Sequence, residues 1–275
     1  MEWIAGFVIA VTVGLTGMGG GSFTVPVLVL MGLPTAEAVG TAMVFAAVLR
    51  LVIAPVYMMR RHVHARYLGL LLLGAMPGLV LGTWALYAIN NSGWKPAVLL
   101  IVGLMLTLSS TLSFVPRLRN PEFAGKNPRW LALVALPIGV ETGFSSAGAG
   151  ALGTILLLNF SEMPVGQVVG TDILFGIVLA CVGSVFHLGW GAINSSTLVH
   201  LLVGGLPGGL AGCVLAKRVP GAKLRTAVAF IAIALGVQLM WVAGRDLIAK
   251  HQQRSRSTDK SVLTATDAKD AKVTR

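Results

Sequence analysis

Charged residues are scarce in this chain of 275 amino acids. They make up 11% of the sequence, and the 10 Asp and Glu are outnumbered by 21 Lys and Arg. A soluble globular domain carries about 25% charged residues. Cysteine is almost absent, and Cys181 and Cys213 both lie inside apolar segments. We interpret them as small helix-packing residues, with a redox or metal role as the alternative. The sequence has no nucleotide-binding, zinc-protease or Ser-His-Asp motif, so it predicts neither an enzyme nor a bound cofactor or metal.

Long apolar runs take the place of the missing charge. The sequence is 55% hydrophobic, and its mean hydropathy is +0.83. A helix needs ~20 apolar residues to cross a bilayer. Eight apolar segments run over approximately 3–33, 35–59, 67–89, 96–115, 130–160, 164–188, 196–216 and 224–249. The sequence therefore predicts an all-α polytopic membrane protein, in which the N-terminus is the first membrane segment rather than a removed signal peptide.

The chain also repeats itself at a spacing of 130 residues, without a gap. The matched positions pair Gly20 with Gly150, Pro34 with Pro164, Gly40-Thr41 with Gly170-Thr171, Gly74 with Gly204, Pro77-Gly78 with Pro207-Gly208 and Gly82 with Gly212. Most of them are Gly or Pro, which bend or break helices. Two copies of one pattern of helix breaks in apolar sequence are typical of a transporter built from internal repeats.

The first and fifth apolar segments are too long for one simple crossing, and each contains a glycine-rich break. The two breaks are Gly17-Met18-Gly19-Gly20-Gly21 and Ser145-Ser146-Ala147-Gly148-Ala149-Gly150. Lipid cannot hydrogen-bond unwound backbone, so a break at this depth must line a cavity or be buried in protein. We expect each segment to form a re-entrant hairpin, or two short helices that meet near the middle of the membrane.

Positive charge falls at non-equivalent places in the two copies. The basic clusters are Arg60, Arg61 and Arg66 after the second segment and Lys217, Arg218, Lys223 and Arg225 after the seventh. Their counterparts 130 positions away carry a single charge, that of Lys95. Basic loops stay in the cytoplasm, so the copies are expected to sit upside down relative to each other. The formal net charge of +11 is thus an orientation signal, and no nucleic-acid partner is predicted.

The predicted fold class is two inverted-topology repeats, each a broken or re-entrant helical hairpin followed by three transmembrane helices. An inverted repeat needs an odd number of crossings, which a hairpin that does not span provides. The predicted divisions are a first repeat over 1–115, a cytoplasmic linker over 116–129, a second repeat over 130–249 and a disordered polar tail over 250–275. One feature disagrees: both termini would lie outside, although the tail is basic.

The two breaks are the candidate substrate site. A helix N-terminus presents unpaired N–H groups and a positive dipole end, which attract anions, and nearby hydroxyl groups can donate to an oxyanion. The candidate residues of the breaks are Gly19, Gly20, Gly21, Ser22, Thr24, Ser145, Ser146, Gly148 and Gly150. The alternative is close helix packing through small residues.

Arg50, Thr41 and Thr171 complete the candidate substrate site. Arg50 is the only basic residue well within an apolar segment, and its planar guanidinium suits an anion; a salt-bridge strut is the alternative. Each Thr lies about two turns into a helix that a proline begins. We expect its hydroxyl either to face the break of its own repeat or to hydrogen-bond to the backbone of its own helix.

Two carboxylates are candidates for coupling transport to protons. Asp172 lies inside an apolar helix, and Glu141 just precedes the second break. An intramembrane carboxylate is costly and often functional. The alternative for Asp172 is a structural partnership with Arg50. Glu37 and Glu162 lie beside helix-initiating prolines, and we interpret them as first-turn acids.

These motifs resemble the TauE/SafE (sulfite exporter) family of bacterial membrane proteins, over about residues 5–248. The resemblance is carried by the run Gly17 to Pro26, Pro34 with Gly40-Thr41, the run Gly139 to Gly150, Pro164 with Val169-Gly170-Thr171-Asp172, and Leu206-Pro207-Gly208-Gly209. The second break departs from the more common three-glycine form, and Asp172 stands where many members have Ser.

The resemblance implies a secondary transporter that exports a small oxyanion, such as sulfite or an organosulfonate, across a bacterial inner membrane. With the two candidate acids, it predicts proton coupling and alternating access between the repeats. The expected partners are a small anionic substrate and the lipid bilayer, and a homo-oligomer is compatible with the sequence. The alternatives are a small-anion channel of the same fold and a transporter of another small organic anion.

Overall fold

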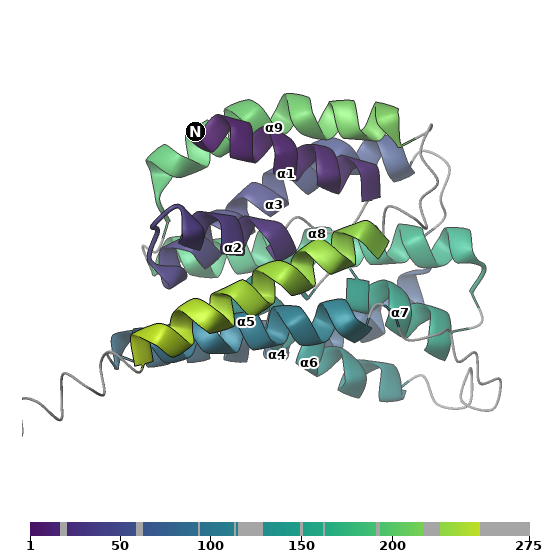
Figure 1. Ribbon diagram of the computed structural model, residues 1–275. Coiled ribbons are helices and arrows are strands. Elements are labelled where there is room, and N and C mark those ends of the chain that lie inside the picture. Colours follow the sequence, from purple (N-terminus) through teal and green to yellow (C-terminus); the bar gives the residue numbers. More distant parts are fainter. Residues whose placement is uncertain are drawn as a thin grey trace, which may run out of the picture.

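Helices make up all the regular secondary structure that the computed structural model describes (Figure 1). The described residues are 1–16, 21–58, 63–92, 94–112, 114, 129–148, 151–161, 163–190, 193–216 and 226–247. The predicted all-α fold class is therefore confirmed. The predicted tail, most of the predicted linker, and the candidate residues Gly19, Gly20 and Gly150 lie outside these ranges.

Each half of the chain contributes two short helices followed by three long ones. The first half forms α1 (Glu2–Thr16), α2 (Gly21–Leu30), α3 (Thr35–Met58), α4 (Ala65–Asn91) and α5 (Lys95–Leu112). The second half forms α6 (Arg129–Ser145), α7 (Ala151–Phe160), α8 (Val165–Gly189), α9 (Ser195–Leu215) and a last helix, Thr226–Leu247. Six of these helices are long and apolar enough to cross a membrane: α3, α4, α5, α8, α9 and the last helix.

A tight turn separates α2 from α3. Gly32 has φ 97°, the left-handed conformation that favours glycine. Its N–H donates to the carbonyl of Val29, and the N–H of Leu33 donates to the carbonyl of Leu28. This pair of bonds is the Schellman pattern that ends a helix. It ends α2 after ten residues, too few to cross a bilayer.

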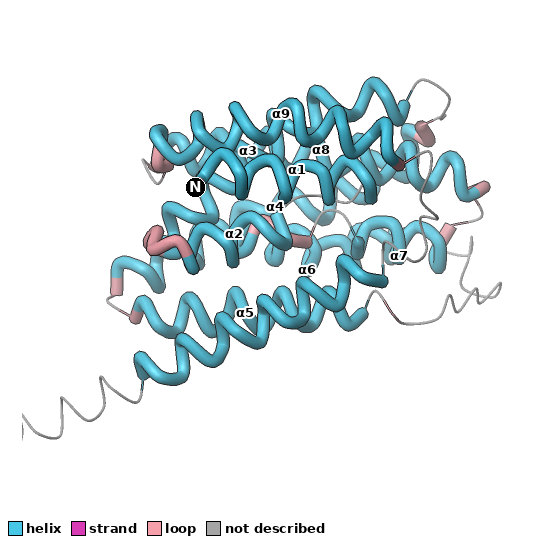
Figure 2. The backbone as a smooth tube through the Cα atoms, turned by 45° about the horizontal axis from the view of Figure 1, so that its top comes forward, coloured by secondary structure: helices cyan, strands magenta, loops and turns pink. Residues whose placement is uncertain are grey.

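Glycine contacts join each half of the chain to the other. α1 lies along α9, and α6 lies along α4 (Figures 1 and 2). A methyl group on Gly74 or Gly78 of α4 would overlap a backbone carbonyl oxygen of α6, that of Ala132 or Leu136. The equivalent positions of α9, Gly204, Gly208 and Gly212, meet the backbone of α1 in the same way. Close approach through small residues spaced four apart is typical of membrane helices.

This packing corrects one interpretation of the repeat. The matched glycines and prolines around 74–82 and 204–212 lie inside the unbroken helices α4 and α9. The glycines provide contact between the halves, whereas Pro77 and Pro207 are exposed, and the helices are not broken there. Of the matched positions that the structure describes, Pro34 and Pro164 lie outside helix, directly before α3 and α8.

The repeat-equivalent helices α3 and α8 cross in opposite directions. Met43 meets Gly183, whereas Arg50 further along α3 meets Gly176, which comes earlier in α8. The crossing is therefore antiparallel and is centred near Val48 and its counterpart Val178. α5 and the last helix also run antiparallel, since Gly103 meets Met240 and Gly236 meets Thr107.

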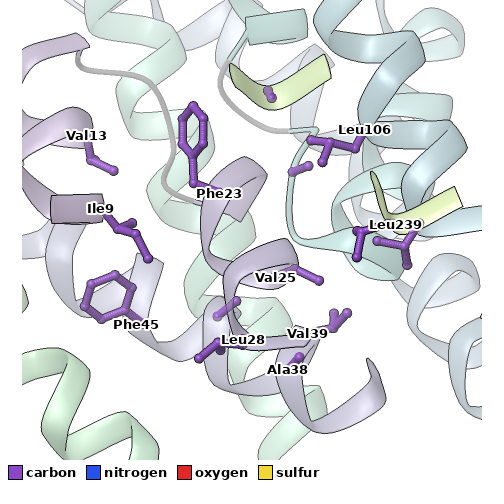
Figure 3. Close-up of a cluster of buried hydrophobic side chains, with 14 of the residues drawn as sticks. Ile9, Val13, Phe23, Val25, Leu28, Ala38, Val39, Phe45, Leu106 and Leu239 are labelled. Carbon is purple, nitrogen blue, oxygen red and sulfur yellow. The ribbon is translucent and has the colours of Figure 1, made fainter. Parts of the chain in front are cut away.

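The short helix α2 is embedded in the molecule. Figure 3 shows Phe23, Val25 and Leu28 of α2 between side chains of α1 and α3 on one side and Leu106 of α5 and Leu239 of the last helix on the other. All belong to one buried apolar cluster. Outward-facing apolar side chains, such as Trp84, Val203 and Trp241, cover the long helices, as a bilayer requires.

We expect Gly78→Ala to destabilise the protein by about 1–3 kcal/mol, because the new methyl group overpacks the contact between α4 and α6. The apparent melting temperature in detergent, measured from the loss of the monodisperse elution peak, should fall by several degrees. Gly69→Ala in the same helix is the matched control, since Gly69 has nothing within 4 Å of its Cβ position. Equal melting temperatures for the two variants would contradict the packing role.

Candidate functional site

The crossing of α3 and α8 holds the basic residue that the sequence singled out. Arg50 is half-buried, and its Nη1 donates to the carbonyl oxygen of Gly176 at 2.5 Å. Its charge also interacts electrostatically with Asp172, one turn earlier in α8. Both residues lack a charged counterpart, since their repeat partners are Ala180 and Ala42. The structure thus brings together two candidate residues that lie 122 positions apart (172 − 50).

α7 holds the Asp172 carboxylate in place from the other side. The hydroxyl of Thr154 donates to Asp172 Oδ2 at 2.6 Å, and both side chains are buried. One residue earlier, a methyl group at Gly153 would overlap Asp172 Oδ1. The glycine therefore leaves room for the carboxylate against the helix. Burying an ionised group requires such partners, because burial without them costs several kcal/mol.

The second predicted break is present between α6 and α7. Ser146, buried, has φ 61°, a left-handed conformation that is uncommon for a residue with a side chain. The chain then folds back, so that Gly148 lies against the last turns of α6, near Thr142 and Ile138. Ser145 donates to the carbonyl of Glu141 at 2.9 Å, and the Ser146 hydroxyl lies 3.6 Å from the sulfur of Met43 in α3.

Glu141 lies in the last turns of α6 just before this break. It is 7% exposed, and Ser109 of α5 hydrogen-bonds its side chain. Its second carboxylate oxygen, Oε1, has no hydrogen-bond partner among the described residues. The counterpart of Glu141 in the first repeat is Val11, so this acid also belongs to one repeat only.

One face of α3 connects the two groups of residues. Met43 and Arg50 are seven positions, or about two turns, apart and so lie on the same face of the helix. Met43 contacts Ser146 at the break, and Arg50 contacts α8. We name the set of Arg50, Asp172, Thr154, Ser146 and Glu141 the central polar group.

Thr41 and Thr171 lie elsewhere. The hydroxyl of Thr41 accepts the backbone N–H of Asn194 at 3.0 Å, and that of Thr171 accepts the backbone N–H of His64 at 3.1 Å. Asn194 and His64 are the N-cap residues of α9 and α4. Each Thr therefore contacts the opposite repeat, an arrangement that neither reading of the sequence anticipated.

The first break is described only from Gly21, where α2 begins. Ser22 is half-buried and Thr24 is fully buried in α2. α2 contacts α6, and Phe23 shares an apolar cluster with Phe144 and Ala147 at the second break. The helix that follows the first break thus approaches the second.

Sequence reasoning missed several polar residues of the interior. Thr154 was detectable, because it lies 130 positions after Thr24 in the matched pattern. Tyr87 and His187 were not: the phenol lies 2.9 Å from Nδ1 of the fully buried imidazole, and their counterparts, Lys217 and Tyr57, show no comparable pair in sequence. Apart from its residue type, nothing in the sequence distinguished Ser109 as a residue of the interior.

Six long apolar helices among the described residues indicate a multi-pass membrane protein. The family profile described as "Sulfite exporter TauE/SafE" matches residues 3–239. The chain belongs to the TauE/SafE family, as the sequence motifs predicted.

Curated relatives support the same class. A "Probable membrane transporter protein YjnA" of Bacillus subtilis is 26% identical over 249 residues, which cover 86% of this chain and 98% of the relative. A "Probable membrane transporter protein" of Xylella fastidiosa is 24% identical over 254 residues, covering 89% of this chain and 96% of the relative. No solved structure matches the chain.

We expect Gly153→Ala to lower the apparent melting temperature by several degrees, because the methyl group displaces the Asp172 carboxylate from Thr154. Loss of a hydrogen bond to a buried charged group costs about 1–3 kcal/mol. Gly189→Ala, at the end of α8 where nothing lies within 4 Å of the Cβ position, is the control. In an Asp172→Ala background, Gly153→Ala should lower the melting temperature only slightly. An equal fall in melting temperature in both backgrounds would contradict this role of Gly153.

Proposed function

We propose that this chain is a secondary transporter that exports a small oxyanion, such as sulfite or an organosulfonate, across a bacterial inner membrane. The observation that carries the proposal is the placement of Arg50, a half-buried cation at the crossing of the two repeat-equivalent helices. The family's description as sulfite exporters supports the substrate class.

The chemistry of the central polar group suits an oxyanion. A guanidinium offers five N–H donors in a planar fork, which matches the oxygens of a tetrahedral or pyramidal anion. Asp172 balances the charge of Arg50 while no substrate is bound, so that the cation is not left unpaired in the membrane. Ser146 adds a hydroxyl from the second break. The anion then competes with Asp172 for Arg50, which makes binding reversible.

Alternating access between inverted repeats is the transport mechanism that this arrangement favours. We assign the first repeat to 1–115, the linker to 116–129 and the second repeat to 130–249. The antiparallel crossings of α3 with α8 and of α5 with the last helix support inversion, because a twofold axis that relates antiparallel partners lies perpendicular to them. In a membrane, that axis lies in the plane of the bilayer.

Glu141 is the candidate carrier of a coupling proton, and Asp172 is the counter-ion of Arg50. The two acids differ in their surroundings. Asp172 has a hydroxyl donor and the electrostatic attraction of Arg50. Glu141 has a hydrogen bond from Ser109, and its Oε1 has no partner among the residues that the structure describes. Ionisable groups inside the membrane that face the protein interior mark ion and proton pathways.

We expect purified protein in proteoliposomes to show saturable flux of radiolabelled sulfite that a pH gradient accelerates. Arg50→Gln should abolish the flux, since it removes the cation and keeps much of the side-chain volume. Glu141→Gln should abolish the effect of the gradient while downhill counterflow of sulfite continues. Arg66→Gln, which changes an exposed arginine outside the central polar group, is the matched control.

The outcomes separate the parts of the proposal. If sulfite produces no flux, an organosulfonate and a small-carboxylate screen in the same vesicles tests the substrate class. Flux that never saturates and shows no counterflow indicates an anion channel. If Arg50→Gln transports like Arg66→Gln, Arg50 has no role in binding the anion.

We expect single-cysteine labelling to confirm the inverted arrangement. Ser92→Cys and Gly189→Cys, after α4 and at the end of α8, should react only with reagent on the periplasmic side. Ala65→Cys and Phe114→Cys, at the start of α4 and after α5, should react only from the cytoplasm, where the basic loops lie. All four positions are exposed. Labelling of Ser92→Cys and Ala65→Cys from the same side would contradict the assigned crossing of α4.

A further inference from the structure

The two threonines of the matched Gly-Thr pairs make the same contact twice. Thr41 in α3 accepts the N–H of Asn194 at the start of α9, and Thr171 in α8 accepts the N–H of His64 at the start of α4. Thr171 is the counterpart of Thr41, and Asn194 is the counterpart of His64 (64 + 130 = 194). Both hydroxyls are fully buried, and the two bonds differ in length by only 0.1 Å (3.1 − 3.0).

The two bonds lie at opposite ends of the helical body. α3 and α9 both begin at the end where α1 begins, whereas α8 and α4 begin at the other, because α3 and α8 are antiparallel. On the orientation given by the basic loops, the bond between Thr41 and Asn194 is periplasmic and that between Thr171 and His64 is cytoplasmic. Each bond crosses from one repeat to the other.

We propose that these two hydrogen bonds are the latches of the two gates, one on each side of the membrane, that open in turn during transport. The inference rests on the alternating access proposed above. Alternating access opens one end of the molecule while the other end stays closed, so the contact of α3 with α9 or that of α8 with α4 must break at one end while its counterpart is kept at the other. With both bonds made, the structure corresponds to a state in which both gates are closed.

The physical reason for a two-state latch lies in the donor. The N–H of an N-cap residue has no acceptor in its own helix. Inside a dry, closed gate it would stay unsatisfied without the threonine, at a cost comparable to a lost hydrogen bond. When water enters an open gate, water replaces the threonine. The bond therefore favours the closed gate, but only by the modest net value of one hydrogen bond, which thermal opening can overcome.

Repeat-equivalent reporters allow the two gates to be tested separately. Ala38 and Val168 lie one turn before the two threonines, and both are fully buried. In a background with Cys181→Ala and Cys213→Ala, Ala38→Cys reports on the periplasmic gate and Val168→Cys on the cytoplasmic gate. The probe is a membrane-impermeant maleimide, added to right-side-out or inside-out vesicles without any substrate.

We expect Thr41→Val to raise the labelling rate of the Ala38→Cys reporter from outside by roughly two- to tenfold, and to leave the Val168→Cys reporter unchanged or slower. Thr171→Val should do the reverse from inside. Thr41→Ser and Thr171→Ser keep the hydroxyl and should label like the parent. Thr111→Val is the control, since that exposed hydroxyl bonds only to its own helix, at Thr107.

The latch is overturned if Thr41→Val leaves the Ala38→Cys rate unchanged, or if it raises both reporters equally, as general loosening would. Only variants with the parent's elution profile and melting temperature are compared. If a valine variant does not fold, Thr41→Ala or Thr171→Ala removes the same acceptor. Because labelling needs no substrate, absence of sulfite flux would reject the proposed substrate and still leave the latch result readable.

Discussion

The glycine contacts between α1 and α9 and between α4 and α6 are the constraint on which the rest of the structure depends. Lipid tails are as apolar as the helices, so burial of apolar surface does not drive helices together in a bilayer, and close backbone packing must do so. Glycines every fourth residue let the backbones touch over three turns. The hairpin of each repeat is thereby fixed to the fourth helix of the other repeat.

These contacts between the two repeats determine where the second break lies. α6 is held along α4, so the strained turn at Ser146 is positioned by the first repeat, although it belongs to the second. The contact of Ser146 with Met43 in α3 adds to the same relation. The second break therefore lies where the two repeats meet.

Symmetric packing carries an asymmetric set of charges. The helices, the packing glycines and the two threonine contacts occur in both halves. The charged residues Arg50, Asp172 and Glu141 do not: their counterparts 130 positions away are Ala180, Ala42 and Val11. Because these features occur in both halves, the two ends of the molecule have equivalent packing. The unrepeated charges lie in its interior, so the asymmetry between the two halves is one of buried charge rather than of packing.

The sequence by itself determined the membrane class, the two copies, their short and long helices and the family, because hydropathy, glycine and proline are local signals that survive without knowledge of contacts. It also identified the buried charges, since an ionised residue in an apolar helix is conspicuous. Only the tertiary structure showed that the glycines of α4 and α9 pack rather than break helices, that Asp172 accepts from Thr154 and interacts electrostatically with Arg50, and that Thr41 and Thr171 bond to the opposite repeat. Each of these depends on which helix lies opposite, and the spacing of residues along one chain does not contain that information.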